Sequence, residues 1–161
     1  MTIFFTARNR ITKLCLILLL TIVPYAFAGD YNSGVTAKIL GKTSVTGNGQ
    51  KITYPVTDRA EVTAMSVDLA PGAETGWHKH PVPVYAYVIS GNLFVEIEDG
   101  KQLSFGAGDA VIEVVDTFHN GKNRGNEPVK LAVFYLGLEG APIVIKPGPT
   151  DNPGYKRINK P

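Results

Sequence analysis

The sequence predicts an all-β domain in which antiparallel strands form a sandwich or a barrel. Short apolar or alternating runs recur along residues 29–161, each ended by turn residues, and no stretch carries a helical periodicity. Seventeen glycines and eleven prolines separate these runs. With 161 residues, 44% of them apolar and 19% charged, the chain has the composition of one globular domain, which excludes a disordered or collagen-like protein.

The first 28 residues are predicted to be a secretory signal peptide. Three basic residues precede the apolar run 14–23, and Ala26-Phe27-Ala28 then supplies an A-x-A cleavage pattern. The run is shorter than the roughly 20 residues that span a membrane, which disfavours the alternative of an uncleaved anchor. We therefore expect a secreted or periplasmic protein whose single domain, residues 29–161, has no membrane association after cleavage.

The predicted mature chain is nearly neutral and has no cysteine. The signal holds three of the sixteen basic residues and none of the fourteen acidic ones, which leaves thirteen basic and fourteen acidic residues and a net charge of −1. This balance implies no basic surface for nucleic acid. Cys15 lies in the signal, so the domain must be stabilised by its core, by a metal or by oligomerisation.

The expected strands follow from the apolar runs and the turn signals between them. Glycines at 47–49 separate the expected strands 36–43 and 51–56. Asp99-Gly100 predicts a tight hairpin because this pair supplies positive φ values. Glycines interrupt the chain again at 121–125, and the polar, Pro- and Gly-rich residues 147–161 predict a loose tail. The expected strands are residues 36–43, 51–56, 61–69, 76–80, 84–89, 93–98, 101–105, 110–115, 129–136 and 143–146.

The candidate chemistry concentrates in the three histidines of the chain. His78 and His80 are two residues apart on an expected strand, so both project from one face, about 6.6 Å apart. This spacing lets two imidazoles converge on one ion, which His119, just past another expected strand, could reach across the sheet. A structural role for two histidines at a strand end is the alternative.

The residues around these histidines resemble the motifs of the cupin superfamily. The first motif of that family has glycine, a His-x-His pair, glutamate and a second glycine. Gly72, His78, His80 and Gly91 match it, and Val84 stands where the glutamate is expected.

The second motif of the family is also matched in part. Gly108, His119 and Asn123 fit the pattern, whereas Val114 and Asp116 replace a proline and a glycine. The resemblance covers roughly residues 60–138. It implies a cupin-type jelly roll, a double-stranded β-helix, with a divalent metal inside the barrel bound by the three histidines. Imidazole ligands suit zinc, iron, copper and nickel alike.

The missing glutamate predicts a site with three neutral ligands. Val84 and Ala86 share a face and are expected to form an apolar pocket wall, with Phe118 at the pocket mouth. Tyr85 is a less favoured fourth ligand because it should point away from Val84.

No carboxylate is expected to replace the missing glutamate. Glu74 lies four residues from His78 along the strand, about 13 Å away. Glu113 has the parity of His119 but is six residues distant, and Glu96 and Glu98 are expected in solvent on the outer face. Three histidines alone are therefore expected to hold the metal.

Two classes of function follow from such a site. Three neutral ligands leave the full charge of the ion and an open position, which favours a small anionic or chelating ligand or an activated water. The protein is then a metal-dependent oxygenase or isomerase, or a non-catalytic module that binds or senses a small molecule or the metal. A metal-free barrel with relic histidines is a third reading. No catalytic residue is predicted. The outward aromatics Tyr85, Tyr87 and Phe94 are expected to be covered by the N-terminal strands or by a second subunit, and a homodimer is expected.

Overall fold

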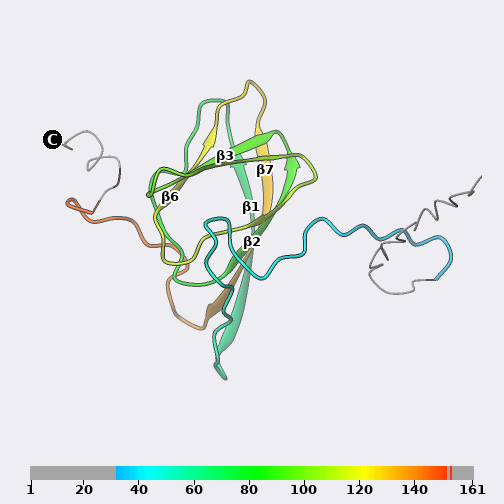
Figure 1. Cartoon of the computed structure of the whole chain (residues 1–161), viewed down its shortest axis with the longest axis horizontal. Coiled ribbons are helices and arrows are strands. Elements are labelled where there is room, and N and C mark those ends of the chain that lie inside the picture. The colour runs from blue at the N-terminus through cyan, green and yellow to red at the C-terminus, as the bar shows by residue number, and fades with distance from the viewer. Residues whose placement is uncertain (1–31, 152, 154–161) are drawn as a thin grey trace, which may run out of the picture. The chain divides into compact units, whose positions relative to one another are not determined.

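The computed structural model describes residues 32–151 and 153 of the chain (Figure 1). It divides the chain into two units, residues 1–38 and 39–161, and every strand of the described residues belongs to the second unit. The predicted signal peptide lies outside the described residues, as does most of the predicted tail beyond residue 151. Among the residues that are described, no helix has the length and apolar character needed to cross a bilayer. The strands are β1 (Ala60–Leu69), β2 (Val84–Ser90), β3 (Asn92–Ile97), β4 (Gln102–Gly106), β5 (Ala110–Ile112), β6 (His119–Asn123) and β7 (Val129–Leu138).

The strands form two antiparallel sheets. The larger sheet has the order β1-β7-β2-β5, and the smaller has the order β4-β3-β6. The long pairing of β1 with β7 runs from Ala60 opposite Leu138 to Leu69 opposite Val129. The predicted all-β architecture of antiparallel strands is confirmed.

The core lies between the inner faces of these sheets and follows from the period-two pattern of the strands. In β7, Val129, Leu131, Val133 and Tyr135 are buried, and the residues between them face outward. Valines and an alanine of β2 and the apolar positions of β3 complete the same core. Each fully buried aliphatic side chain stabilises the fold by roughly 1.5–3 kcal/mol.

The predicted hairpin at Asp99-Gly100 joins β3 and β4. Gly100 has a φ of 96°, and its N–H donates to the carbonyl of Ile97 at 2.9 Å. The backbone N–H of Lys101 donates to Oδ1 of Asp99 at 2.8 Å. The N–H of Ile97 donates to the carbonyl of Lys101 at 2.9 Å, so three residues, 98–100, form the loop between this pair, with glycine in the left-handed position that such loops require.

Four of the expected strands are not strands in the structure. Residues 36–43 form none, and the other three make only isolated bridges: Lys51 with Val45, His78 with His119, and Lys79 with Ile145. The segment 76–80 begins at Gly76, whose φ is 72°, and runs into Pro81 and Pro83, which cannot donate to a ladder.

Strand β6 was expected to be part of a turn. Its sequence, His-Asn-Gly-Lys-Asn, lacks the β-branched and aromatic residues that favour strands. It is nevertheless extended because it pairs with β3 from Ile97 opposite His119 to Leu93 opposite Asn123. Tertiary pairing therefore overrides the local preference and fixes the position of His119.

Candidate metal centre

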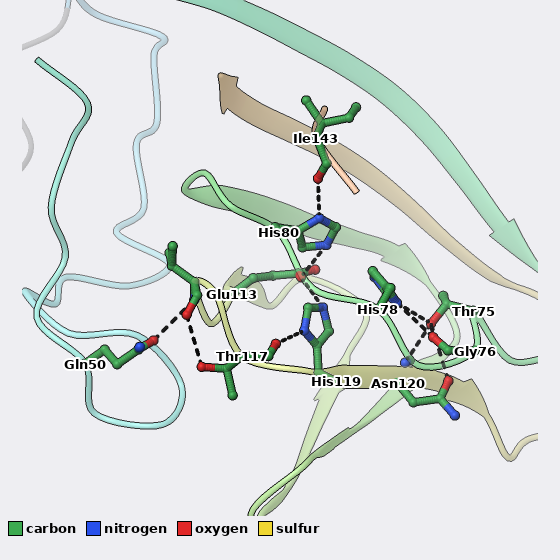
Figure 2. Close-up of polar contacts among 12 residues, drawn as sticks. Gln50, Thr75, Gly76, His78, His80, Glu113, Thr117, His119, Asn120 and Ile143 are labelled. Atoms are coloured by element: carbon green, nitrogen blue, oxygen red, sulfur yellow. Dashed lines mark hydrogen bonds and ion pairs between the residues drawn. The ribbon is translucent and has the colours of Figure 1, made fainter. Parts of the chain in front are cut away.

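The three histidines of the chain lie together in the interior (Figure 2). His78 and His80 belong to the segment between β1 and β2, and His119 is the first residue of β6. Two backbone hydrogen bonds, of 3.0 and 2.8 Å, tie His78 to His119. All three side chains are buried, and their candidate ligand atoms lie within 4.8 Å of one another. The predicted convergence of the three rings is confirmed.

Each imidazole is oriented by a hydrogen bond from Nδ1 to a backbone carbonyl. Nδ1 of His78 lies 2.8 Å from the oxygen of Gly76, and Nδ1 of His119 lies 3.0 Å from that of Thr117. Nδ1 of His80 lies 2.7 Å from the oxygen of Ile143, in the segment after β7 (Figure 2). A carbonyl oxygen only accepts, so Nδ1 must carry the proton, and in the neutral ring Nε2 keeps its lone pair. Histidines that bind metals are commonly fixed in this way.

Glu113 also belongs to the cluster, and the expectation that no carboxylate reaches the histidines was wrong. Its Oε2 atom lies 3.0 Å from Nε2 of His119 and 3.3 Å from Nε2 of His80 (Figure 2). The prediction counted the six residues from Glu113 to His119 as if they continued one strand. Glu113 instead follows β5, and His119 begins β6, which belongs to the other sheet. The chain turns between them at Asp116, whose φ is 50°, and this turn brings Glu113 back over His119.

The donor set fits a bound cation. Oε2 of Glu113 and Nε2 of His119 are fully buried and have no hydrogen-bond partner in the described part of the chain. With the proton on Nδ1, these two atoms are both acceptors, and two buried acceptors 3.0 Å apart require a positive charge between them. Two ligands at about 2.1 Å from one ion lie about 3.0–3.4 Å apart, so the spacing suits a metal such as zinc.

The electrostatics of the cluster favour a negative Glu113 carboxylate and shift the pKa values of His78 and His119 in opposite directions. Burial lowers the pKa of His78 to about 4, helped by the positive charge that His119 carries when protonated. Burial also acts to lower the pKa of His119, but the Glu113 carboxylate more than offsets it and raises that pKa. Burial alone would raise the pKa of Glu113, whereas the hydrogen bonds and positive charge that His119 and His80 supply when Nε2 is protonated bring it well below its ordinary value.

The cluster opens into a small cavity of about 50 Å³. Since roughly 10–15 Å³ of such space holds one water, an ion and a ligand of a few atoms fit there. The ring of Tyr135 packs edge-on against His80, with centroids 5.3 Å apart. The cavity walls are formed mainly by apolar side chains, with Val67, Leu93, Val95, Leu131 and Val133 among them.

The predicted pocket residues do not line this cavity. Val84 and Ala86 do face the interior, but neighbouring side chains cover them, and they are 1% and 5% exposed. Phe118 precedes His119 and therefore points to the opposite face, where the Lys79 ammonium lies 5.6 Å from the centre of its ring.

Tyr85 does not belong to the histidine cluster. Its hydroxyl donates to the hydroxyl of Tyr54 at 3.2 Å. Burial and this contact raise its pKa to about 12. Tyr85 therefore points away from Val84, as its parity predicts, and is excluded as the fourth ligand.

Two further glutamates differ in their surroundings. Glu96, expected in solvent, is only 8% exposed and pairs with Lys122 at 3.0 Å. Glu74 accepts a hydrogen bond of 2.6 Å from the side-chain amide of Asn120. Its carboxylate therefore contacts Asn120 and not the histidines.

Comparison with known proteins agrees with the motifs. Residues 65–135 match the family model described as a cupin domain. A Cupin 2 conserved barrel domain protein from Salinispora arenicola is 22% identical over 53% of this chain and 71% of its own, with a TM-score of 0.44. An uncharacterised Klebsiella pneumoniae protein with a double-stranded β-helix domain is 25% identical over 56% of this chain and 78% of its own, with a TM-score of 0.44.

A third solved structure, the DMSP lyase DddQ from Ruegeria pomeroyi, is 19% identical over 62% of this chain and 47% of its own, with a TM-score of 0.47. This chain thus spans about half the length of that enzyme. No curated protein matches the sequence. The matched domain model, together with the all-β architecture, identifies residues 65–135 of this chain as a cupin domain.

Proposed function

We propose that the protein is a metal-binding cupin in which His78, His80 and His119 hold one divalent ion. The observation that carries this proposal is the common orientation of the three rings. Each ring donates from Nδ1 to a backbone carbonyl, which leaves three Nε2 lone pairs in one buried cluster. An arrangement that keeps three buried acceptors together without a cation would be unfavourable.

The bound ion would act as a Lewis acid or would lower the pKa of a coordinated water. The residues of the chain would control access to it. Apolar side chains from both sheets line the cavity beside the cluster, and its small volume restricts the ligand to a few atoms. A small anionic or chelating ligand fits these conditions best. Zinc, iron, copper and nickel all suit the donor set.

Elemental analysis of the purified protein tests the metal proposal. We expect about one metal per chain in the unmodified protein and little in His80→Ala, because that change removes one of the three imidazoles. Tyr85→Phe is the matched control, since it alters an aromatic residue outside the cluster and should retain the metal. If the protein remains metal-free after exposure to each of the four metals, the metal proposal fails, and the alternative of a metal-free barrel with relic histidines is favoured.

A second candidate function is a binding or sensing module without turnover. The cavity offers few acid or base groups besides the histidines and Glu113. Thr75 lines it, but its hydroxyl is occupied by the carbonyl of Gly76 and the N–H of Gly121. Tyr135 is the remaining polar group, and burial raises the pKa of its phenol.

Turnover assays separate these two functions. Oxygen consumption by the metal-loaded protein with 1,3-dicarbonyl or catechol-like compounds would favour the oxygenase. Calorimetric binding of small carboxylates or chelators, with no product across the same panel, would favour the module. His80→Ala serves as the common control because both functions require the metal.

Export of the protein is a further part of the proposal. The basic start, short apolar run and A-x-A pattern of residues 1–28 support it. N-terminal sequencing after expression in a secreting host should give a mature chain that begins at Gly29. A protein recovered with residues 1–28 intact would favour the uncleaved anchor.

We also propose that two copies of the chain associate through the outer face of the larger sheet. Tyr87, Ile89 and Phe134 are 40%, 53% and 45% exposed there, and Tyr87 and Phe134 lie on neighbouring strands. Light scattering coupled to size exclusion should give the mass of a dimer. A monomer at all accessible concentrations would remove this part of the proposal.

A further inference from the structure

We propose that Glu113 is the fourth protein ligand of the metal and takes over the role of the glutamate that the cupin pattern places at Val84. This inference rests on the proposed function and adds one residue to it. It replaces a site of three neutral imidazoles with one that carries a negative ligand.

The contacts of Glu113 support direct ligation. Its Oε2 atom lies close to two of the three Nε2 atoms, at 3.0 Å from His119 and 3.3 Å from His80. These separations are those of neighbouring ligands around one ion with bonds of about 2.1 Å. The side chain is 16% exposed, and the Oε2 atom itself is fully buried.

Other partners for this carboxylate are lacking in the described residues. The lysines that form ion pairs there contact other carboxylates, and none joins Glu113: Lys79 pairs with Asp116, Lys122 with Glu74 and Glu96, and Lys130 with Asp68. The histidines therefore provide its only charged contacts in that part of the chain. A buried carboxylate is unfavourable unless a cation compensates it, and a divalent ion shared with the histidines would do so.

Strand register explains how Glu113 can stand in for a glutamate at position 84. β2 and β5 are antiparallel, with Tyr85 opposite Ile112 and Ala86 opposite Val111. The ladder continues by one step, because the N–H of Glu113 donates to the carbonyl of Val84 at 3.0 Å. Directly opposed residues present their side chains on the same face, with Cβ atoms about 4.5–5.5 Å apart. The carboxylate has thus moved to the neighbouring strand and still faces the interior.

A different role for Glu113 makes a different prediction. The carboxylate could pair only with a protonated His119 and stay outside the coordination sphere when metal binds. In that case the loss of the carboxylate would leave the metal affinity and the coordination spectrum as they were, or would improve the affinity by making His119 easier to deprotonate.

Cobalt binding to three variants tests the inference. Co²⁺ affinity is measured by competition with a coloured chelator, and the d–d absorption reports the coordination. Glu113→Gln should weaken Co²⁺ binding by more than about 100-fold, beyond the 10–100-fold loss typical of an outer-shell partner. It should also change the absorption spectrum. Glu61→Gln is the matched control, because Glu61 is an exposed glutamate of β1 outside the cluster, and it should behave as the unmodified protein.

The exchange variant Val84→Glu/Glu113→Val returns the carboxylate to β2 with the same composition. It should bind Co²⁺ within about tenfold of the unmodified protein, a range below the 10–100-fold loss of an outer-shell partner. Unchanged affinity and spectrum in Glu113→Gln would overturn the inference and leave three-histidine binding intact. Failure of the unmodified protein to bind Co²⁺, Zn²⁺, Fe²⁺, Cu²⁺ or Ni²⁺ would instead overturn the proposed function.

Infrared difference spectroscopy on the unmodified protein covers the case in which the variants do not fold. Addition of Zn²⁺ should shift the stretching bands of one carboxylate. Zinc binding without any carboxylate shift would also overturn the inference.

Discussion

Nε2 of His119 and Oε2 of Glu113 lie 3.0 Å apart in the interior of the barrel, and neither atom has a proton to share when the ring is neutral. A positive charge placed between them resolves this contact. Either a proton on His119 or a metal ion provides that charge, so protons and metal compete for one position.

Metal removal should destabilise the fold. A ligand that binds only the folded state at 100 times its dissociation constant raises the free energy of unfolding by about 2.7 kcal/mol. Thermal unfolding before and after treatment with a strong chelator should therefore show a lower melting temperature for the treated protein. In His80→Ala the chelator should make no difference, and an equal effect on both proteins would contradict metal binding at this cluster.

Metal occupancy should fall as the pH is lowered, because imidazole binds metal only in its neutral form. The raised pKa of His119 means that its protonation begins at a higher pH than the ordinary 6.5 of histidine. His78, with its pKa near 4, stays neutral over this range and does not compete. Zinc occupancy at fixed free zinc, measured from pH 8 to pH 5, tests this prediction. A constant occupancy would count against histidine ligation.

Removal of a core side chain should cost stability in proportion to its burial. Ile97 on β3 has no exposed surface, so Ile97→Ala should lower the free energy of unfolding by about 2–5 kcal/mol. Val56→Ala provides the control, since Val56 is fully exposed ahead of β1 and should change stability by less than about 0.5 kcal/mol. Urea denaturation of the two variants gives the comparison. Similar losses for both would contradict the placement of Ile97 in the core.

The turn between β2 and β3 should accept only glycine. Gly91 has a φ of 78°, and a Cβ at this position would come within 2.7 Å of the carbonyl oxygen of Pro128. Gly108 has a φ of 94° but open space around it. Gly108→Ala should therefore cost about 1–2 kcal/mol from the left-handed backbone alone. Gly91→Ala should cost more, since the clash adds to this strain, and equal losses by urea denaturation would show that the turn relaxes.

The sequence was sufficient for the fold class and for the identity of the histidines. Alternating apolar residues determine which face of β2, β3 and β7 is buried, because successive side chains of a strand point to opposite sides. The cupin motifs identify His78, His80 and His119 from the sequence alone. Strand β6 escaped prediction because its polar residues become extended only by pairing with β3.

The place of Glu113 was decided by the tertiary structure alone. Along the chain it is six residues from His119, and no periodicity connects the two. The turn at Asp116 and the pairing of β5 with β2 bring the carboxylate back to the rings. A local pattern determines which side of a strand a residue occupies, whereas the meeting of two strands from different sheets depends on how the whole barrel closes. The three histidines could therefore be predicted from the sequence, whereas the position of the Glu113 carboxylate beside them could not.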